Sequence, residues 1–359
     1  MTLSHHPAET ITAIGYGVLY ALSSAGEILA VKSLNYNSPP LQLPTYTALL
    51  SNQVWLFMLP IYWLQRKERR SLKGSYLSQY MAMGCLTFTI TLLRNISVNV
   101  MPGSVFSLLI STSIVFNIVL SNLFLKKAFT YWHIAAAIFC IAAAFSIGFT
   151  ALFTSQEDFK EVDYKVGVST AITAAFFIAL MNVSQEYIQP TWDNYNVRIV
   201  EMTIASSLVA SVFTVIYGTF SKEITSWSPA ILAATQAREG LVLVICISCA
   251  LPILKLLVRN TKYATIKNSS AFFFEFAQSS GSLLGSIANI LVFGEPWGVG
   301  YIIAIILMTI SFVLYAQTKR KANMPPPPDY PKGDIRILNP IVMTTTTPGK
   351  VVVVVSLWK

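Results

Sequence analysis

The chain has 359 residues, of which 54% are hydrophobic and only 11% are charged, and its mean hydropathy is +0.59. A soluble domain carries about 25% charged residues, so this composition excludes an ordinary water-soluble fold. The long, uniformly apolar runs also exclude a collagen-like chain, a disordered chain and the short alternating strands of a transmembrane barrel. The remaining class is an α-helical membrane protein.

About ten apolar segments are long enough to cross a bilayer, which takes roughly 20 residues per helix. They lie at 11–31, 43–64, 76–98, 103–125, 131–152, 166–188, 197–220, 240–258, 265–292 and 299–318. The sequence therefore predicts an all-α polytopic membrane protein with ten transmembrane helices.

Ten spans joined by short loops divide into two halves of five, and five is odd, so the second half is inverted relative to the first. Secondary transporters often have this plan and bind substrate near the midplane, where the halves meet. The predicted parts are an N-terminus at 1–10, a first half at 11–152, an acidic connecting loop at 153–165, a second half at 166–318 and a low-complexity tail at 319–359.

Lysine and arginine concentrate in one of the two alternating sets of loops. That set holds Arg66, Lys67, Arg69, Arg70, Lys73, Lys126, Lys127, Arg198, Lys255, Arg259, Lys262, Lys267, Lys319, Arg320 and Lys321, and the other holds Lys32, Lys160, Lys165, Lys222 and Arg238. Because cationic loops are retained in the cytoplasm, both termini are expected there. This bias accounts for most of the net charge of +9, so the expected partner is a lipid bilayer and not nucleic acid. A plasma membrane and an internal membrane both remain open.

Ionisable residues inside membrane helices are costly unless they are paired or hydrated, which makes them the first functional candidates. Five stand out: Glu27, Arg94, Glu186, Lys255 and Glu275. Glu27 and Arg94 are predicted to form an ion pair lining an outer vestibule, although a static strut or snorkelling to the interface would also explain them. Glu275 is the deepest carboxyl, and apolar surroundings favour its neutral form. It is the first choice for proton coupling, with a purely structural, hydrogen-bonded glutamate as the alternative. Glu186 and Glu201 are further candidates for coupling or charge pairing.

Polar side chains follow the fourth and ninth predicted helices. An inverted repeat would bring them face to face at the midplane, where they would offer donors and acceptors to a small-molecule substrate. The candidate substrate-binding residues are Asn52, Gln53, Ser113, Asn117, Asn182 and Gln278. For the individual serines, close helix packing is the more ordinary role, as it is for the Gly281-x-x-x-Gly285 step, which is also a candidate hinge.

Three stretches carry a family resemblance. Residues 101–127, with Pro102-Gly-Ser104, Ser-Leu-Leu and Phe116-Asn117, resemble the fourth helix of plant purine permeases and, less closely, that of chloroquine-resistance-type transporters. Residues 167–215 resemble the purine-permease pattern, with a glycine-led helix followed by two glutamates, here Glu186 and Glu201. The run VFGEP at 292–296 is similar to the turn before the last helix of the drug/metabolite transporter superfamily. The resemblance implies that superfamily's EamA-like fold of ten helices in two inverted halves.

No phosphate-binding loop and no H-E-x-x-H motif occurs in the sequence, and its acids are scattered, so neither an enzyme nor a cofactor or metal site is expected. The predicted function is a secondary transporter of a small organic solute, working by alternating access and coupled to protons. The purine-permease resemblance favours a nucleobase-like heterocycle. The alternatives are a nucleotide-sugar or phosphate-ester exchanger, against which the scarcity of cations expected in the cavity argues, and a chloroquine-resistance-like exporter of amino acids or peptides. A homodimer is left open.

Overall fold

The computed structural model describes residues 7–36, 44–64, 74–100, 106, 109–154, 161–192, 195–235, 238–293 and 298–322. Regular structure in these residues is helical, without strands, which confirms the predicted all-helical class. The chain divides into two units, Met1–Lys319 and Arg320–Lys359. All the contacts described below lie within the first unit.

The helices follow the predicted apolar segments closely. They are α1 (Pro7–Tyr36), α2 (Pro44–Asn52), α3 (Val54–Leu64), α4 (Gly74–Val100), α6 (Ser113–Leu125), α7 (Tyr131–Thr154), α8 (Glu161–Ile188), α9 (Tyr195–Phe220), α10 (Glu223–Thr235), α11 (Arg238–Asn268), α12 (Ala271–Phe293) and α13 (Val299–Ala322), with a short 3-10 turn at Gln189–Thr191.

Several elements differ from the prediction. The second segment is broken at Gln53 into α2 and α3. The amphipathic α10 was not predicted, and α7 and α8 both extend into the predicted connecting loop. The largest difference is in α11, which continues ten residues beyond the predicted end at Val258. Charged residues lower the hydropathy there and made the sequence look like a loop.

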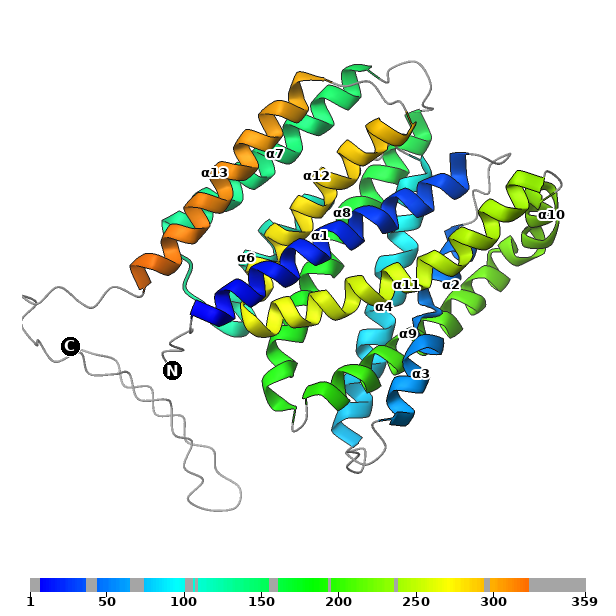
Figure 1. The fold of residues 1–359 in the computed structure, drawn as a ribbon, viewed down its shortest axis with the longest axis horizontal. Helices are drawn as coiled ribbons and strands as arrows, with labels where there is room; N and C mark the ends of the chain where they lie inside the picture. The colour runs from blue at the N-terminus through cyan, green and yellow to red at the C-terminus, as the bar shows by residue number, and fades with distance from the viewer. Residues whose placement is uncertain are drawn as a thin grey trace, which may run out of the picture. The chain divides into compact units, whose positions relative to one another are not determined.

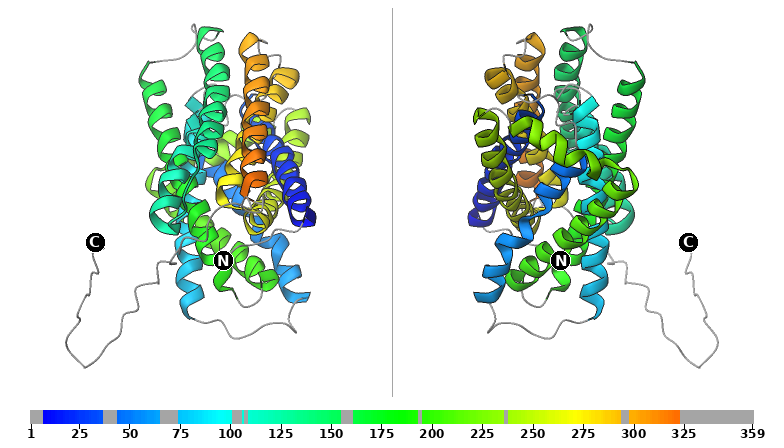
Figure 2. Two further views of the ribbon diagram at one scale, coloured as in Figure 1. Left: turned by 90° about the vertical axis from the view of Figure 1, so that its left-hand side faces the viewer. Right: turned by 90° about the vertical axis from the view of Figure 1, so that its right-hand side faces the viewer.

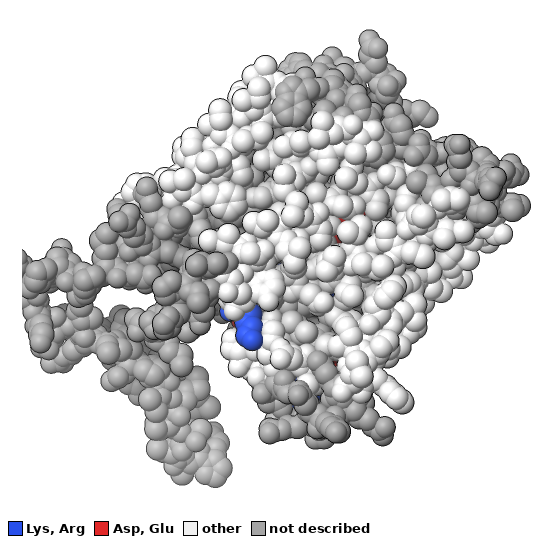
Figure 3. All heavy atoms as spheres, viewed as in Figure 1, with Lys and Arg blue, Asp and Glu red and all other residues white. Residues whose placement is uncertain are grey.

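Apolar length and composition make four helical stretches clear candidates for crossing a membrane: Thr12–Val31, Tyr76–Val100, Lys165–Thr191 and Tyr195–Phe220. Shorter apolar helices occur at Leu109–Leu125, Tyr131–Ser146 and Val299–Tyr315. On the face shown in Figure 3, charged atoms are almost absent from the described residues, as expected for a surface in contact with lipid.

Hydrogen bonds between helix ends define one end of the bundle, which we call the first end. The Tyr76 hydroxyl at the start of α4 donates to the Thr191 carbonyl after α8, over 3.3 Å. Lys127, just after α6, pairs with Glu186 near the end of α8. Glu186 also accepts a hydrogen bond from the backbone N–H of Ala271, the first residue of α12, over 3.2 Å. Helices α4 and α12 therefore start at this end, and α6 and α8 finish there.

A second set of contacts defines the opposite, second end. The Asn95 amide near the end of α4 donates to the Pro44 carbonyl at the start of α2, over 3.1 Å. The Ser97 hydroxyl donates to the Gly167 carbonyl near the start of α8, over 2.9 Å. Helices α4 and α8 are therefore antiparallel, as they must be if successive helices cross the same layer in opposite directions.

Helix α1 packs mainly against α11 and α12, far from it in sequence, whereas α8 packs against α4 and α6. Figures 1 and 2 show α1 lying beside α11 and α12. Glycines permit the close approach of α12 to α1, because a Cβ added at Gly281 would lie 3.1 Å from the Cα of Ala21. A Cβ at Gly285 would lie 3.1 Å from Cδ1 of Ile28. Small residues at such steps are the usual means of close helix packing in lipid.

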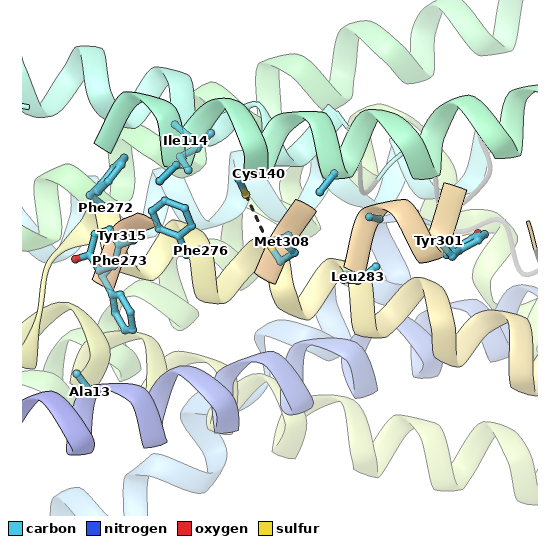
Figure 4. Packing of buried hydrophobic residues seen from close by; sticks show 14 residues of the cluster. Ala13, Ile114, Cys140, Phe272, Phe273, Phe276, Leu283, Tyr301, Met308 and Tyr315 are labelled. Carbon is cyan, nitrogen blue, oxygen red and sulfur yellow. Dashed lines mark hydrogen bonds between the residues drawn. The ribbon is translucent and has the colours of Figure 1, made fainter. Parts of the chain in front are cut away.

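Helices α7 and α13 run side by side along one flank of the bundle (Figure 1). The Ser311 hydroxyl donates to the Ala136 carbonyl over 2.6 Å, and that of Ser146 donates to the Gly300 carbonyl over 3.0 Å, which fixes an antiparallel register. Figure 4 shows Cys140 of α7 facing Met308 of α13, with sulfur atoms 3.9 Å apart. Aromatic rings of α12 and Tyr315 fill the space next to this pair.

Candidate functional site

A polar cavity lies between α1, α4, α8, α11 and α12, with a free volume of about 70 Å³. Its polar and charged lining residues are Tyr20, Ser24, Thr87, Thr91, Arg94, Gln185, Lys255, Arg259, Lys262, Tyr263, Gln278 and Ser282. A cavity needs about 10–15 Å³ for each water-sized probe, so this one has room for several waters in the conformation described. Of the residues predicted to bind substrate, only Gln278 is among the described lining residues.

Three cations of α11 line the cavity. Lys255, Arg259 and Lys262 stand four and three residues apart, a spacing that puts side chains on one face of a helix. Each is only 7% exposed. The sequence places Lys255 inside the predicted segment 240–258 and Arg259 and Lys262 in the loop after it, and the loop prediction is wrong because α11 runs without interruption through all three.

The partner of Glu27 is Lys255 and not the predicted Arg94. The Lys255 ammonium lies 2.7 Å from the Glu27 carboxylate, and both side chains are almost completely buried between α1 and α11. Arg94 lies near this pair, since all three residues line a second, smaller cavity. Its guanidinium stands over the Phe106 ring, 6.0 Å from the ring centre. Lys255 lies inside the predicted segment 240–258, but the sequence does not show that this segment is the neighbour of α1, as the packing of α1 on α11 does.

Arg259 is anchored to α9 by one end of its guanidinium. Its Nη1 donates to the hydroxyls of Ser206, over 3.3 Å, and of Ser207, and to the Thr203 carbonyl over 3.4 Å. The other end, Nη2, is buried and has no hydrogen-bond partner. An arginine side chain carries its charge at any physiological pH, so the lining contains a fixed positive charge with an unsatisfied donor.

Glu275 is completely buried in α12 and accepts hydrogen bonds from two other helices. Ser113 and Asn117 of α6 donate over 2.5 Å and 3.2 Å, and Asn182 of α8 donates over 2.7 Å. Three of the polar side chains predicted to bind substrate therefore surround the predicted coupling carboxyl. Since all three act as donors, the arrangement is suited to an ionised carboxylate.

Gln278 connects this carboxyl cluster to the cavity. Its amide nitrogen lies 3.4 Å from the Ser113 hydroxyl, which in turn donates to Glu275. Gln278 also lines the cavity. A change at the Glu275 carboxyl can thus reach the cavity wall through one serine.

Asn52 and Gln53 lie at the break between α2 and α3 and not among the described residues that line the cavity. The Asn52 side chain is fully buried with both amide atoms unpartnered, and the Gln53 amide donates to the Leu49 carbonyl over 3.3 Å. Helix α2 packs against α9, α4 and α11.

Glu186 and Glu201 both pair with cations towards the first end. Glu186 pairs with Lys127, and Glu201 lies 2.6 Å from Arg198, three residues before it on α9. The Tyr80 hydroxyl also donates to Glu201, over 3.0 Å. Neither glutamate is among the described lining residues of the cavity, so the structure gives each a local ion pair.

Residues 33–324 match the family model for purine nucleobase transmembrane transport. The chain belongs to this family of purine nucleobase transporters. Family membership and the apolar helices together identify an integral membrane protein that moves small molecules, and they confirm the resemblance to purine permeases.

Comparison with solved structures adds information about the fold. A protein of known crystal structure matches 87% of this chain and 99% of its own length, with 12% identity and a TM-score of 0.57. At that identity the likeness concerns the fold alone. A comparison with curated proteins found no match.

Sequence reasoning missed the cationic face of this purine nucleobase transporter. The spacing of Lys255, Arg259 and Lys262 was visible in the sequence, and with helix periodicity it was enough to indicate one face of a helix. Hydropathy outweighed this spacing, because three charges within eight residues are typical of the end of a membrane segment.

Proposed function

We propose that this purine nucleobase transporter carries its substrate through the central cavity by alternating access, and that Glu275 couples the movement to a proton. The observation that carries the proposal is the position of Glu275, completely buried and held by donors from α6 and α8, one serine away from the cavity wall. Binding and release of a proton by a positioned carboxyl is an ordinary role for such a group.

The packing of the helices supports two inverted halves related by a pseudo-two-fold axis. The first helix of one half, α1, packs on α11 and α12, and the first helix of the other, α8, packs on α4 and α6. Each first helix thus packs on the other half, as two halves related by such an axis do. This relation and the alternating direction of the helices favour ten crossings in an EamA-like arrangement. An even number of crossings puts both termini on one side, and the loop charges make that side the cytoplasmic one.

The coupling works through the hydrogen bonds of the carboxyl cluster. An ionised Glu275 accepts from Ser113, Asn117 and Asn182 at once. A protonated carboxyl must place its own hydrogen on one of these partners, and Ser113 is able to accept it by turning its hydroxyl. That turn changes the hydrogen bond between the Ser113 hydroxyl and Gln278, which lines the cavity. The proton and the substrate therefore both act on Gln278.

Uptake into proteoliposomes tests this proposal. The protein is reconstituted and supplied with labelled purine nucleobases, adenine among them, with and without an inward proton gradient. The expected result is gradient-driven accumulation by the native protein. Glu275→Gln keeps the size of the side chain but removes the proton site, so it abolishes accumulation and still allows counterflow exchange of the same nucleobase. Gradient-driven accumulation by Glu275→Gln would overturn the coupling role.

A matched control uses a carboxyl outside the cluster. Glu223 on α10 accepts the backbone N–H of Thr45 at the second end over 2.9 Å. Glu223→Gln removes the same charge at a distance from Glu275, and gradient-driven accumulation should survive it. If both variants lose accumulation equally, the loss reports removal of a carboxyl in general and not coupling at Glu275.

The cations in the cavity favour a second candidate function. An exchanger of nucleotide sugars or other phosphate esters is expected to bind its anionic substrate with several lysines or arginines, and four of the described lining residues are of these types. The same proteoliposomes, preloaded with a nucleotide sugar or an amino acid, test the exchanger and the amino acid exporter by counterflow.

A further inference from the structure

The described lining of the central cavity is strongly positive. Arg94, Lys255, Arg259 and Lys262 line it, and none of its described lining residues is acidic. The nearest carboxyls are engaged elsewhere: Glu27 pairs with Lys255, and Glu275 is held by its three donors. Uncompensated charge inside a membrane protein is costly. A lining of this kind is therefore stabilised by an anion in the cavity.

Arg259 shows where that anion would bind. Its Nη1 is fixed by hydroxyls of α9, while its Nη2 is buried without a partner on a side chain that lines the cavity. The guanidinium is therefore already oriented, and a ligand that accepts from Nη2 loses little conformational entropy on binding. Arginine has only donors, so the atom it contacts must be an acceptor, and a negatively charged one binds best.

Arg94 and Lys262 make aromatic contacts and no ion pair among the described contacts. Arg94 stands over the Phe106 ring at 6.0 Å, and the Lys262 ammonium lies 5.5 Å from the Phe274 ring centre. Such contacts stabilise a cation without neutralising it. The positive potential of both side chains consequently remains available to a ligand in the cavity.

We infer that the transported solute is an anionic oxopurine, a planar purine whose ring has lost a proton and whose exocyclic groups are carbonyl oxygens. The inference rests on the proposed transport of a purine and names its charge and its functional groups. A carbonyl next to a deprotonated ring nitrogen accepts from Arg259 and is attracted by Arg94 and Lys262. Adenine can accept a hydrogen bond through its ring nitrogens, but it has no carbonyl oxygen and its ring is neutral at pH 7, so it lacks the negative charge that the cations of the lining attract.

Gln185 supplies a complementary acceptor. Its Oε1 is buried without a hydrogen-bond partner, and the residue lines the cavity from α8, across from α11. An oxopurine retains ring N–H groups after losing one proton, and one of them can donate to this oxygen. The cavity thus offers an unsatisfied donor on Arg259 and an unsatisfied acceptor on Gln185, and an anionic oxopurine carries groups complementary to both.

Binding of urate and adenine to the purified full-length protein tests the inference. Urate is an oxopurine and a monoanion at neutral pH. Calorimetric titration should give a lower dissociation constant for urate than for adenine. Arg259→Gln should raise the urate constant by about tenfold or more, as expected for a lost hydrogen bond to a charged group, and should leave any adenine binding nearly unchanged. Lys222→Gln, which removes an exposed cation outside the described lining, should change neither constant.

Two further variants guard against loss of the fold. If Arg259→Gln does not yield folded protein, Lys262→Gln and Arg94→Gln should each reduce the preference for urate over adenine, which is a ratio measured within one preparation. Tighter binding of adenine than of urate by the native protein would overturn the inference, and so would an unchanged ratio in all the cavity variants. In either case, gradient-driven adenine uptake would leave the proposed function standing. Binding of a phosphate ester without any purine would overturn both.

Discussion

The Glu27–Lys255 pair joins α1 to α11 through two side chains that are 7% and 9% exposed. Bringing two charges out of water costs several kcal/mol per ion, and their attraction repays this cost only in good geometry. Removal of one partner therefore leaves the other as an uncompensated buried charge. The pair is a weak source of net stability and a strong constraint on how the two helices are paired.

A double-mutant cycle measures that constraint. Glu27→Gln and Lys255→Met should each lower the free energy of unfolding by about 3–5 kcal/mol. The double variant should lose much less than the sum, because no charge is left alone. Thermal unfolding in detergent gives the values.

The same cycle with Arg94 identifies the partner. Glu27→Gln combined with Arg94→Gln should show a coupling energy well below that of Glu27 with Lys255, because Arg94 makes no ion pair with Glu27 among the described contacts. A larger coupling with Arg94 would restore the pairing expected from the sequence.

At the scale of helices, close approach at glycines holds the bundle together. Gly84 on α4 faces α9 so tightly that an added Cβ would lie 2.5 Å from the Cβ of Val209. The position of the Val209 Cβ is fixed by its backbone, so a side-chain rotation cannot relieve this contact and one of the two helices must move. The contact between α4 and α9 is thus set by the absence of one methyl group.

Gly84→Ala should destabilise the protein by about 1–3 kcal/mol, the usual cost of overpacking a well-packed core. Gly15→Ala on α1 is the matched control, since a Cβ there has no heavy atom within 4 Å and alanine is the better helix former. Gly15→Ala should be neutral or slightly stabilising. The melting temperatures of the two variants, measured in one detergent, test this prediction. Equal values would show that α9 can move to accommodate the added methyl group without loss of stability.

For the bundle of helices, the sequence is sufficient to predict the all-helical class and the positions of most helices. Both follow from the low charge and the long apolar runs, because a helix that crosses the hydrocarbon core of a bilayer must be long and apolar. The carboxyl cluster was predicted only as separate residues. Asn117 and Asn182 were assigned to substrate, since their contact with Glu275 depends on how three helices are rotated about their axes, and hydropathy does not encode that rotation.

The buried cations of α11 show a second limit of prediction from the sequence. A positive loop and a positive face of a helix inside a cavity have the same composition, and the positive-inside rule treats both as loops. The structure distinguishes the two, because α11 continues as one helix through the cations. With Lys255, Arg259 and Lys262 removed from the loops, the cationic set still includes Arg66–Lys73, Lys126 and Lys127, so the predicted orientation keeps its basis.

Thiol labelling tests that orientation. Ala128 is exposed after α6 at the first end, and Ser221 is exposed between α9 and α10. In a background without native cysteines, Ser221→Cys should react with an impermeant reagent added outside intact cells, and Ala128→Cys should react only after permeabilisation. For a protein resident in an internal membrane, sealed vesicles of that membrane replace the cells. The reverse pattern would place both termini on the outer side.

The packing of α1 against α11, far from it in sequence, has a consequence for how the chain is made. About 200 residues separate the end of α1 at Tyr36 from the start of α11 at Arg238, and ribosomes add roughly 5–20 residues per second. Helix α1 therefore waits about 10–40 s in the insertion machinery or the bilayer before Lys255 exists to meet Glu27. During that interval a glutamate inside an apolar helix must be sheltered by something other than its final partner. Biogenesis of this protein is therefore open to failure at its first helix, long before the last one has been synthesised.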